Sequence, residues 1–322
     1  MHKISSLLPV ALAGLSLLIP GIGRADNVFV SSNGNNSVEE IIDNQVTQFI
    51  FNSPNLAGPT GLALDSQGNL YVANNSSPGS GFIAKFSPTG AFIENVATGL
   101  SNPRGLVFDS AGNLFVANQS GNSITEIPAG GGSATTVVTG LSFPNGLTFD
   151  AAGNLYVTNG ANKTVDKISF SGGSATTTPF ITSGLADPNG VVAVTSGLLA
   201  GDILVVDKGS STVLAFDSNG NLLPSNPFID DANPNDIPKY IAVDSAGDFY
   251  VTDAGDNHVT EYGPDGTFIR VFTTDVDGNS AFSGACAVIT QQLVVPEPST
   301  YALLLGGAAM LVFLARRKRM MA

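Results

Sequence analysis

The sequence predicts an all-β fold, a six-bladed β-propeller of four-stranded antiparallel blades that is closed by the C-terminal strand completing the first blade. A short phrase, N-L-F-V-A-N at 113–118, recurs at spacings of 42, 44, 41, 48 and 46 residues. Each copy is rich in β-forming residues and is bounded by Gly, Asn and Asp. Repeats of this length and composition are typical of propeller blades. The copies begin at Asn27, Asn69, Asn113, Asn154, Asp202 and Asp248.

The first two strands of each blade are predicted on either side of a tight turn. A run such as P-R-G-L-V-F-D at 103–109 leads into a link with Asp first and Gly fourth. Asp can accept bonds from backbone amides and Gly can take a positive φ, so this link predicts a hairpin. The following phrase is apolar on both faces, so we expect neighbouring blades to cover it. The predicted bulky core residues between blades are Tyr71, Phe115, Tyr156 and Tyr250.

Two further runs complete each blade, and the chain ends predict how the ring closes. A third run, as at 82–86, is followed by a second Gly turn, such as D-S-N-G at 217–220, and a fourth run. The first copy has no P-x-G run ahead of Asn27, whereas 283–290 resembles a first strand with no blade after it. We therefore predict that this last strand completes the first blade, which removes exposed sheet edges.

The repeat also carries a family resemblance. The pattern P-x-G-L-x-x-D-x-x-G-N-L-Y-V-x-N, followed by G-N-S-I-T-E-I or D-N-H-V-T-E-Y, resembles NHL repeats. More broadly it resembles the six-bladed propellers of the gluconolactonase and senescence marker protein type. The resemblance covers roughly 27–290 and implies a fold more than an activity, because propellers host many unrelated functions.

The N-terminal segment 1–25 is predicted to be a signal peptide. It has a short polar head, an apolar stretch at 7–22, and small residues at Gly23 and Ala25, the two positions that a signal peptidase inspects. We expect the mature chain to begin at Asp26. A retained membrane anchor is the alternative, which is disfavoured because a Pro-Gly pair breaks a run already short for a span.

The C-terminal segment 295–322 is predicted to be a sorting signal that follows a propeller domain at 26–294. The motif is formed by Val295, Pro296, Glu297, Pro298 and Ser299. An apolar stretch at 301–315 follows, predicted as a short transmembrane helix, and its 15 residues are fewer than the ~20 that span comfortably. The basic stop that marks its cytoplasmic end consists of Arg316, Arg317, Lys318 and Arg319.

This order of motif, helix and basic tail resembles the PEP-CTERM sorting signal. The resemblance implies export across the inner membrane of a Gram-negative bacterium, transient anchoring by the C-terminal helix, and processing by an exosortase. It also implies a final place at the cell surface or outside the cell, often alongside extracellular polysaccharide. A plain C-terminal membrane tail is the alternative.

Charge narrows the classes of partner. Of the 13 cations, six lie in the two targeting ends, which leaves seven against 25 acids in 26–294 and a net charge near −18. So acidic a domain argues against nucleic acid or anionic lipid as a general partner. The lone Cys286 cannot form an internal disulfide, and its apolar surroundings predict a buried thiol.

The catalytic inventory is thin, and it predicts that the chain is not an enzyme. His258 is the only histidine outside the signal segment, at a position where NHL repeats often carry histidine as part of the blade. A Ser-His-Asp triad, or a histidine base of the virginiamycin lyase type, would rest on this one residue, and no G-x-S-x-G elbow is present. One His and one Cys also fall short of a zinc site.

The alternative is a calcium-dependent lactonase of the gluconolactonase type. In that family the metal lies in the central channel, held by Glu, Asn and Asp near the starts of inner strands. Asn145 resembles the family's Asn ligand, but Asn189 stands where an acid is expected, and Thr60 is offered without a Glu. Neutral groups remove the charge that holds a hard cation. No cofactor is therefore predicted, and calcium is left open.

The same positions suggest a ligand-binding ring at one mouth of the channel. The residues between Pro and Gly, with their counterpart in the closing strand, are Thr60, Arg104, Asn145, Asn189, Lys239 and Ser283. Two cations and several neutral hydrogen-bonding groups would suit an anionic or hydroxyl-rich ligand such as a sugar acid. Solvated turn residues are the alternative.

Two acidic loops, at 230–236 and 275–279, cluster oxygen atoms of the kind that calcium prefers, although neither matches an EF-hand. Solvated loops are the expected interpretation. The function predicted overall is an exported, surface- or matrix-associated, non-enzymatic propeller that binds a polysaccharide or a surface protein.

Overall fold

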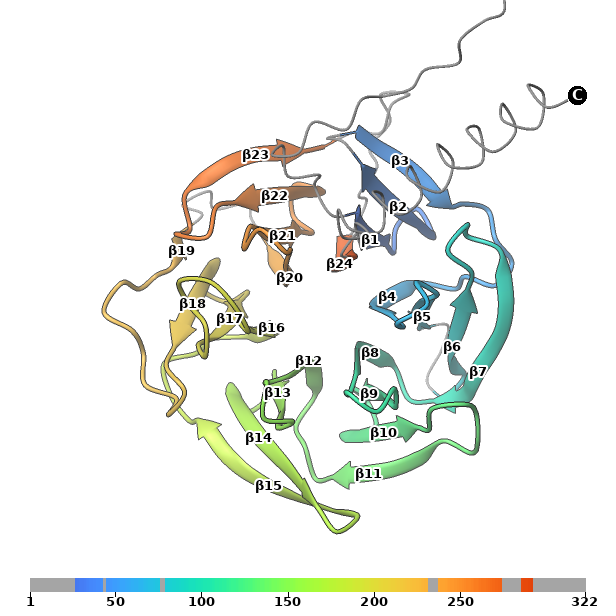
Figure 1. Ribbon diagram of the computed structural model, residues 1–322, viewed down its shortest axis with the longest axis horizontal. Coiled ribbons are helices and arrows are strands. Elements are labelled where there is room, and N and C mark those ends of the chain that lie inside the picture. The colour runs from blue at the N-terminus through green and yellow to red at the C-terminus, as the bar shows by residue number, and fades with distance from the viewer. Residues whose placement is uncertain (1–26, 43–44, 76–78, 231–236, 274–284, 292–322) are drawn as a thin grey trace, which may run out of the picture.

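The computed structural model describes residues 27–42, 45–75, 79–230, 237–273 and 285–291, the last by backbone alone. Six four-stranded antiparallel sheets are arranged around a central axis (Figure 1), which confirms the predicted six-bladed propeller. No helix in these ranges is long and apolar enough to cross a membrane.

Each blade consists of four strands, numbered below from the centre of the ring outwards. Blade 1 contains β24 (Ala285–Gln291), β1 (Asn27–Ser32), β2 (Ser37–Ile42) and β3 (Gln45–Ile50). Blade 2 contains β4 (Pro59–Leu64), β5 (Leu70–Asn74), β6 (Gly81–Phe86) and β7 (Phe92–Leu100). Blade 3 contains β8 (Pro103–Phe108), β9 (Leu114–Asn118), β10 (Ser123–Ile127) and β11 (Thr135–Thr139).

The other three blades follow the same order. Blade 4 contains β12 (Pro144–Phe149), β13 (Leu155–Asn159), β14 (Thr164–Ser171) and β15 (Ser174–Ile181). Blade 5 contains β16 (Pro188–Ala193), β17 (Ile203–Asp207), β18 (Thr212–Phe216) and β19 (Ile229–Asp230). Blade 6 contains β20 (Pro238–Val243), β21 (Phe249–Asp253), β22 (His258–Tyr262) and β23 (Phe268–Phe272).

The ring closes as predicted. β24, from the C-terminal part of the chain, pairs antiparallel with β1, with Phe29 opposite Ile289 and Val30 opposite Val288. β24 therefore takes the innermost place of blade 1, next to β20 and β4 (Figure 1). Strands from both ends of the propeller thus share one sheet, which leaves no blade incomplete.

The core lies between the blades. All five residues of the second strand are buried in β5, β9, β13, β17 and β21. Side chains alternate between the two faces of a strand, so burial of all five requires a neighbour on each face. Phe115 of blade 3, for example, shares a cluster with Leu147 and Leu155 of blade 4. The four predicted core aromatics are all buried.

The Asp hairpins also form as predicted. In blade 4, the amides of Ala152 and Asn154 donate to Asp150 Oδ1 at 2.9 and 2.8 Å, and Gly153 takes φ +81°. Blades 2, 3 and 6 repeat these bonds at their own turns. We call the end of the propeller that carries Asp65, Asp109, Asp150 and Asp244 the turn end.

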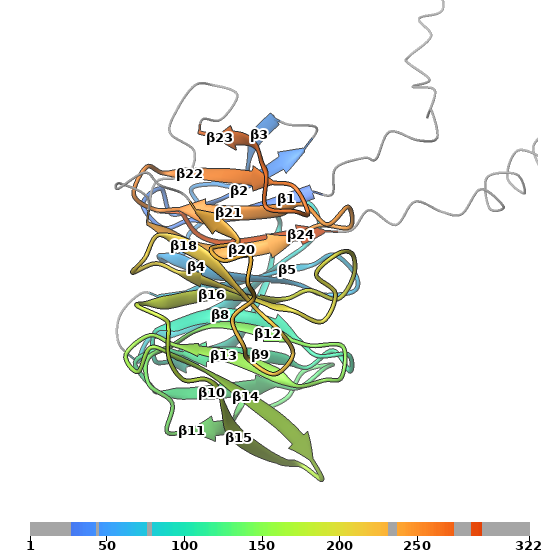
Figure 2. The ribbon, with the colours of Figure 1, turned by 90° about the vertical axis from the view of Figure 1, so that its left-hand side faces the viewer.

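The opposite end is the one at which the inner strands begin. Because strands alternate in direction within a blade, the end of each second strand lies beside the start of the first, as Asn118 lies opposite Pro103. We call this end the mouth, defined by Pro59, Pro103, Pro144, Pro188 and Pro238. In Figure 2 the ring is seen from the side, with its strands running between the two ends.

Candidate binding site at the mouth of the channel

The structure places the predicted P-x-G residues on one ring. A methyl group added to Gly105 would overlap the carbonyl oxygen of Asn145 in the next blade. The inner strands approach this closely because glycine has no side chain. The same contact joins Gly61 to Arg104, Gly105 to Asn145, Gly146 to Asn189 and Gly190 to Lys239.

Thr60 lies on this ring, but its hydroxyl is used in hydrogen bonds to the backbone. Its side chain is fully buried, and its hydroxyl lies 2.8 Å from the carbonyl oxygen of Pro103 in the next blade and 3.1 Å from that of Ala73. The hydroxyl of Thr158 likewise donates to the carbonyl oxygen of Asn189. These hydroxyls hold adjacent blades together, so Thr60 does not face a ligand.

Blades 3 and 4 are joined across the mouth by a chain of amides beside Arg104. Asn102 Nδ2 donates to Gln119 Oε1 at 2.8 Å, and Gln119 Nε2 donates to Asn145 Oδ1. Asn145 is only 5% exposed, so the chain fixes its side chain. Arg104 Nε and Asn102 Oδ1 are buried and have no hydrogen-bond partner among the described residues. A buried donor without a partner is costly and therefore favours a polar ligand.

We call the polar side chains around the prolines of the mouth, which begin with Asn102, Gln119 and Asn145, the polar arc. Blade 5 continues the polar arc with an ion pair. Lys208 Nζ lies 3.0 Å from Asp187 Oδ2, and both side chains remain more than a third exposed. These two residues occupy the places that Asn102 and Gln119 occupy in blade 3, directly before the proline and directly after the end of the second strand. Gly160, at the corresponding place in blade 4, leaves room for the side chain of Asn145.

Phe143 stands at the rim in the middle of this arc. It precedes Pro144, its ring is 49% exposed, and its backbone has φ +54°. The corresponding residues of blades 2 and 3, Gly58 and Asn102, also take positive φ, which Gly and Asn tolerate far better than a bulky side chain. A strained residue that exposes an aromatic ring is a functional candidate.

The remaining predicted residues are placed as follows. Lys239 and Asn189 lie on the ring and are partly buried. Ser283 falls outside the described residues, as does the side chain of Cys286. His258 opens β22 and is 9% exposed, so it lies within its blade.

The channel beneath the ring is narrow and largely apolar. Its cavity of about 200 Å³ is lined by residues of five inner strands, including Leu106, Leu147 and Ile241, with Thr148 and Tyr240 the polar side chains. In the described part of the chain, no three His, Cys, Asp or Glu side chains are grouped to hold a metal. The acidic loops that left calcium open lie mostly outside that part, which excludes all of 275–279 and most of 230–236.

The sequence missed five residues of the arc, namely Asn102, Gln119, Phe143, Asp187 and Lys208. Each lies one position outside the P-x-G run or one position beyond the second strand. The residue before each proline could have indicated this site. It is Gly in blade 2 and Asn in blade 3, but Phe in blade 4.

Comparisons with known proteins place the targeting signal. Residues 294–319 match the family model of the PEP-CTERM protein-sorting motif. The chain carries this motif. The motif implies that the protein is exported, that an exosortase recognises it, and that its C-terminal region anchors it in the membrane before processing. The match agrees with the predicted motif at 295–299 and basic stop at 316–319, all outside the described residues. The sequence matches no curated protein closely enough to count as a relative.

Solved structures share the propeller fold at low identity. The nidogen/laminin complex contains a chain that matches with a TM-score of 0.65 and 18% identity, over 83% of this chain and 98% of that one. Virginiamycin B lyase from Staphylococcus aureus matches with a TM-score of 0.56 and 19% identity, over 76% and 80%. A gluconolactonase from Xanthomonas campestris matches with 0.57 and 16%, over 71% and 84%.

These likenesses correct one prediction. The thin catalytic inventory predicted that the chain is not an enzyme, and that prediction is wrong, because two of these propellers of the same shape are enzymes. At such identities the likeness shows the fold alone and assigns no substrate.

Proposed function

We propose that this exported propeller binds a hydroxyl-rich, negatively charged carbohydrate at its mouth. The observation that carries the proposal is Phe143, an aromatic ring held exposed by a strained backbone in the middle of a polar arc. The face of a sugar ring is apolar and its edge bears hydroxyls. An aromatic platform flanked by amide side chains provides for both.

The distribution of cations supports a negatively charged ligand. The domain has seven cations, and three of them, Lys85, Lys167 and Arg270, contact carboxylates away from the mouth. The other four, Arg104, Lys163, Lys208 and Lys239, lie on the ring or on the loops at the mouth. In a domain with a net charge near −18, this is the end where an acidic sugar is least repelled.

The targeting signals supply the setting. We infer that residues 1–25 direct export as a signal peptide, and that an exosortase cleaves near 295–299 and releases the domain to the cell surface or matrix, where extracellular polysaccharide is found. Mass spectrometry of the protein recovered from cells tests this step. The expected mass ends near 295–299, whereas a mass that retains 316–319 contradicts processing.

Binding is tested with polygalacturonate and glucuronate as probes, using the full chain and titration calorimetry. We expect Phe143→Ala and Arg104→Ala each to weaken binding about tenfold, because each removes one contact of about 1–2 kcal/mol. Phe268→Ala is the matched control, since that ring is 63% exposed on the outer strand of blade 6.

Failure is equally clear in this assay. If the wild-type chain binds neither probe, or if both mouth variants bind as well as wild type, the proposed site is wrong. Chain length of the recovered polymer is measured in parallel, so that an enzymatic step at the mouth is seen together with binding.

A further inference from the structure

At the turn end, two blades hold a lysine ammonium in a built-in site. In blade 2, Lys85 Nζ lies 3.5 Å from Asp65 Oδ2 and 5.0 Å from the centre of the Tyr71 ring. In blade 4, Lys167 Nζ lies 3.9 Å from Asp150 Oδ2 and 5.4 Å from the Tyr156 ring. A carboxylate and an aromatic ring thus attract one ammonium in each case.

In blade 6 the cation beside the carboxylate comes from a different strand. Its third strand has Glu261 where blades 2 and 4 have lysine. A cation comes instead from the fourth strand, where Arg270 Nε lies 2.6 Å from Glu261 Oε2. Burial raises the pKa of Glu261, and Arg270 opposes this rise. Blades 2, 4 and 6 therefore each supply their own cation.

Blade 3 has the carboxylates without the cation. Glu126 takes the position of the lysine, opposite Phe115 in place of a tyrosine, and the fourth strand offers Thr135 opposite it. Asp109 Oδ2 keeps only the bond from Asn113 Nδ2, at 2.9 Å, and lacks the tyrosine hydroxyl and the lysine. The Glu126 carboxylate has no hydrogen-bond or ion-pair partner among the described residues.

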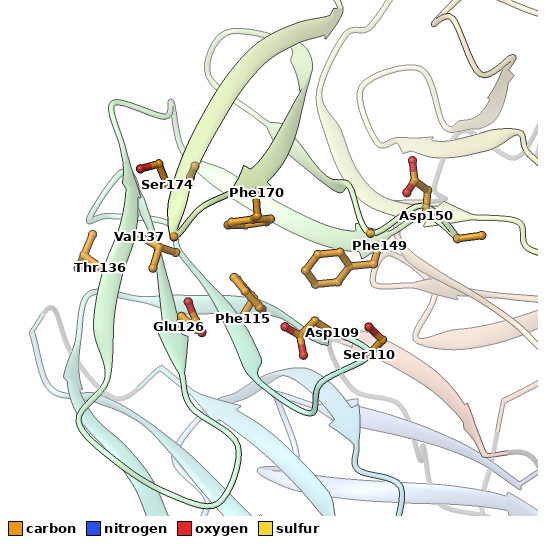
Figure 3. A pocket seen from close by; sticks show the side chains of 14 residues that line it. Asp109, Ser110, Phe115, Glu126, Thr136, Val137, Phe149, Asp150, Phe170 and Ser174 are labelled. Atoms are coloured by element: carbon orange, nitrogen blue, oxygen red, sulfur yellow. The ribbon is translucent and has the colours of Figure 1, made fainter.

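These carboxylates border a cleft of about 830 Å³ between blades 3 and 4 (Figure 3). Phe115 packs against Phe149 at 5.2 Å and against Phe170 at 5.3 Å between ring centres. Phe170 belongs to the long β14–β15 hairpin and is 36% exposed. In Figure 3, Asp109 and Glu126 are seen on either side of the Phe115 ring. The cleft combines an aromatic wall with three carboxylates, of which Asp150 already pairs with Lys167.

We propose that this cleft binds an alkylammonium group from outside the chain, in the place that Lys85 and Lys167 fill in blades 2 and 4. The ammonium would lie near Asp109 and Glu126, beside the Phe115 ring, and its alkyl stem would lie along the more exposed Phe170. A divalent metal fits less well, because the aromatic wall supplies none of the oxygen ligands that such ions need. This site lies at the end opposite the mouth, so it is independent of carbohydrate binding.

The test uses the full chain and n-pentylammonium as the probe, with pentanol as its neutral analogue, followed by calorimetry. We expect pentylammonium to bind about tenfold more tightly than pentanol. Glu126→Lys should abolish binding and raise Tm, because the new lysine would pair with Asp109 as Lys85 pairs with Asp65 in blade 2. Asp230→Lys, a charge reversal at an exposed residue of the outermost strand of blade 5, should leave binding unchanged.

Glu126→Gln provides a second test if Glu126→Lys does not fold, with binding expected to weaken about fivefold. Nα-acetyl-lysine methylamide distinguishes the source of the ammonium. Binding as tight as that of pentylammonium indicates a lysine side chain of a partner protein, and weaker binding indicates a free amine. The proposal is overturned if wild type binds pentylammonium no better than pentanol, or if neither change at Glu126 alters binding.

Discussion

The two ends of this propeller use the same repeat in different ways. At the turn end, Asp65, Asp150 and Asp244 each accept two backbone amides and a tyrosine hydroxyl, so that three blades form nearly identical corners. At the mouth, the residue before each proline differs between blades 3, 4 and 5, where it is Asn102, Phe143 and Asp187. Where every blade needs the same residue, that residue holds the fold, and the variable positions are available for binding.

Blade 3 shows that this division has an exception. Its turn Asp109 keeps the backbone bonds of the hairpin, yet Phe115 and Glu126 replace the tyrosine and the lysine found in blades 2 and 4. The fold tolerates this change because the backbone bonds, rather than the cation, define the turn. A position freed from the structural role can then bind a ligand.

The largest effect should come from the ring glycines. A methyl group in Gly105→Ala would overlap the carbonyl oxygen of Asn145 and lie 3.0 Å from the amide of Leu147. Backbone of two blades would have to move, so we expect a loss of about 3 kcal/mol in the free energy of unfolding, measured by denaturant titration. Gly121→Ala, whose nearest neighbours are side-chain atoms at 3.2 Å, should lose less than about 1 kcal/mol. Equal losses would contradict the role of the ring.

Removal of a turn carboxylate should rank second. Asp150→Ala strands the amides of Ala152 and Asn154 and removes a bond from the Tyr156 hydroxyl. We expect a loss of about 2 kcal/mol in the same titration. Asp217→Ala is the matched control, because Asp217 accepts the same pair of amides in an outer turn, without tyrosine or lysine. If Asp217→Ala loses as much free energy of unfolding, the contacts of Asp150 with Tyr156 and Lys167 add nothing to the stability of the turn.

A substitution at the mouth should raise the free energy of unfolding, whereas the two changes above lower it. Phe143→Asn places at φ +54° a residue that tolerates this conformation, so we expect the variant to gain about 1 kcal/mol of stability. It also removes the aromatic platform, so carbohydrate binding should weaken about tenfold, as in Phe143→Ala. Higher stability with weaker binding would separate the two roles of this residue, whereas a destabilised variant would mean that Phe143 packs a core.

Acid should produce the smallest effect. Burial alone would raise the pKa of Asp65 and Asp150, but hydrogen bonds from Asn69 and Asn154 bring it below the ordinary value. Each folded carboxyl therefore binds fewer protons than the unfolded one, and its stabilisation is complete above the ordinary pKa and lost as pH falls through the folded pKa. We expect Tm to fall below about pH 4 and to fall less steeply in Asp150→Asn. Parallel profiles would contradict this assignment.

The fold could be predicted because its determinants repeat. Blade number, the Asp hairpins and the closing strand all follow from patterns that occur several times, and a repeat averages out the ambiguity of any one copy. The buried tyrosines followed from the same reasoning. Closure needed only the missing first strand before Asn27 and the extra strand after blade 6.

The positions of the candidate site could be predicted only in part, because several of them depart from the repeat pattern. The ring positions Arg104, Asn145 and Asn189 could be counted from each proline. The roles within the ring could not, since the use of Thr60 as a bridge between blades depends on the carbonyl oxygen of Pro103, 43 residues away. The positive φ at Phe143 could be inferred only by comparison with Gly58 and Asn102, which take the same conformation in blades 2 and 3.

The division between the two ends is tested most directly by hydrogen exchange of the full chain with and without polygalacturonate. We predict slower exchange at the mouth, in segments 101–104, 119–122 and 142–145, and no change in the turns at 65–69 and 150–154. Protection confined to the turns, or no protection at saturating polymer, would contradict this division.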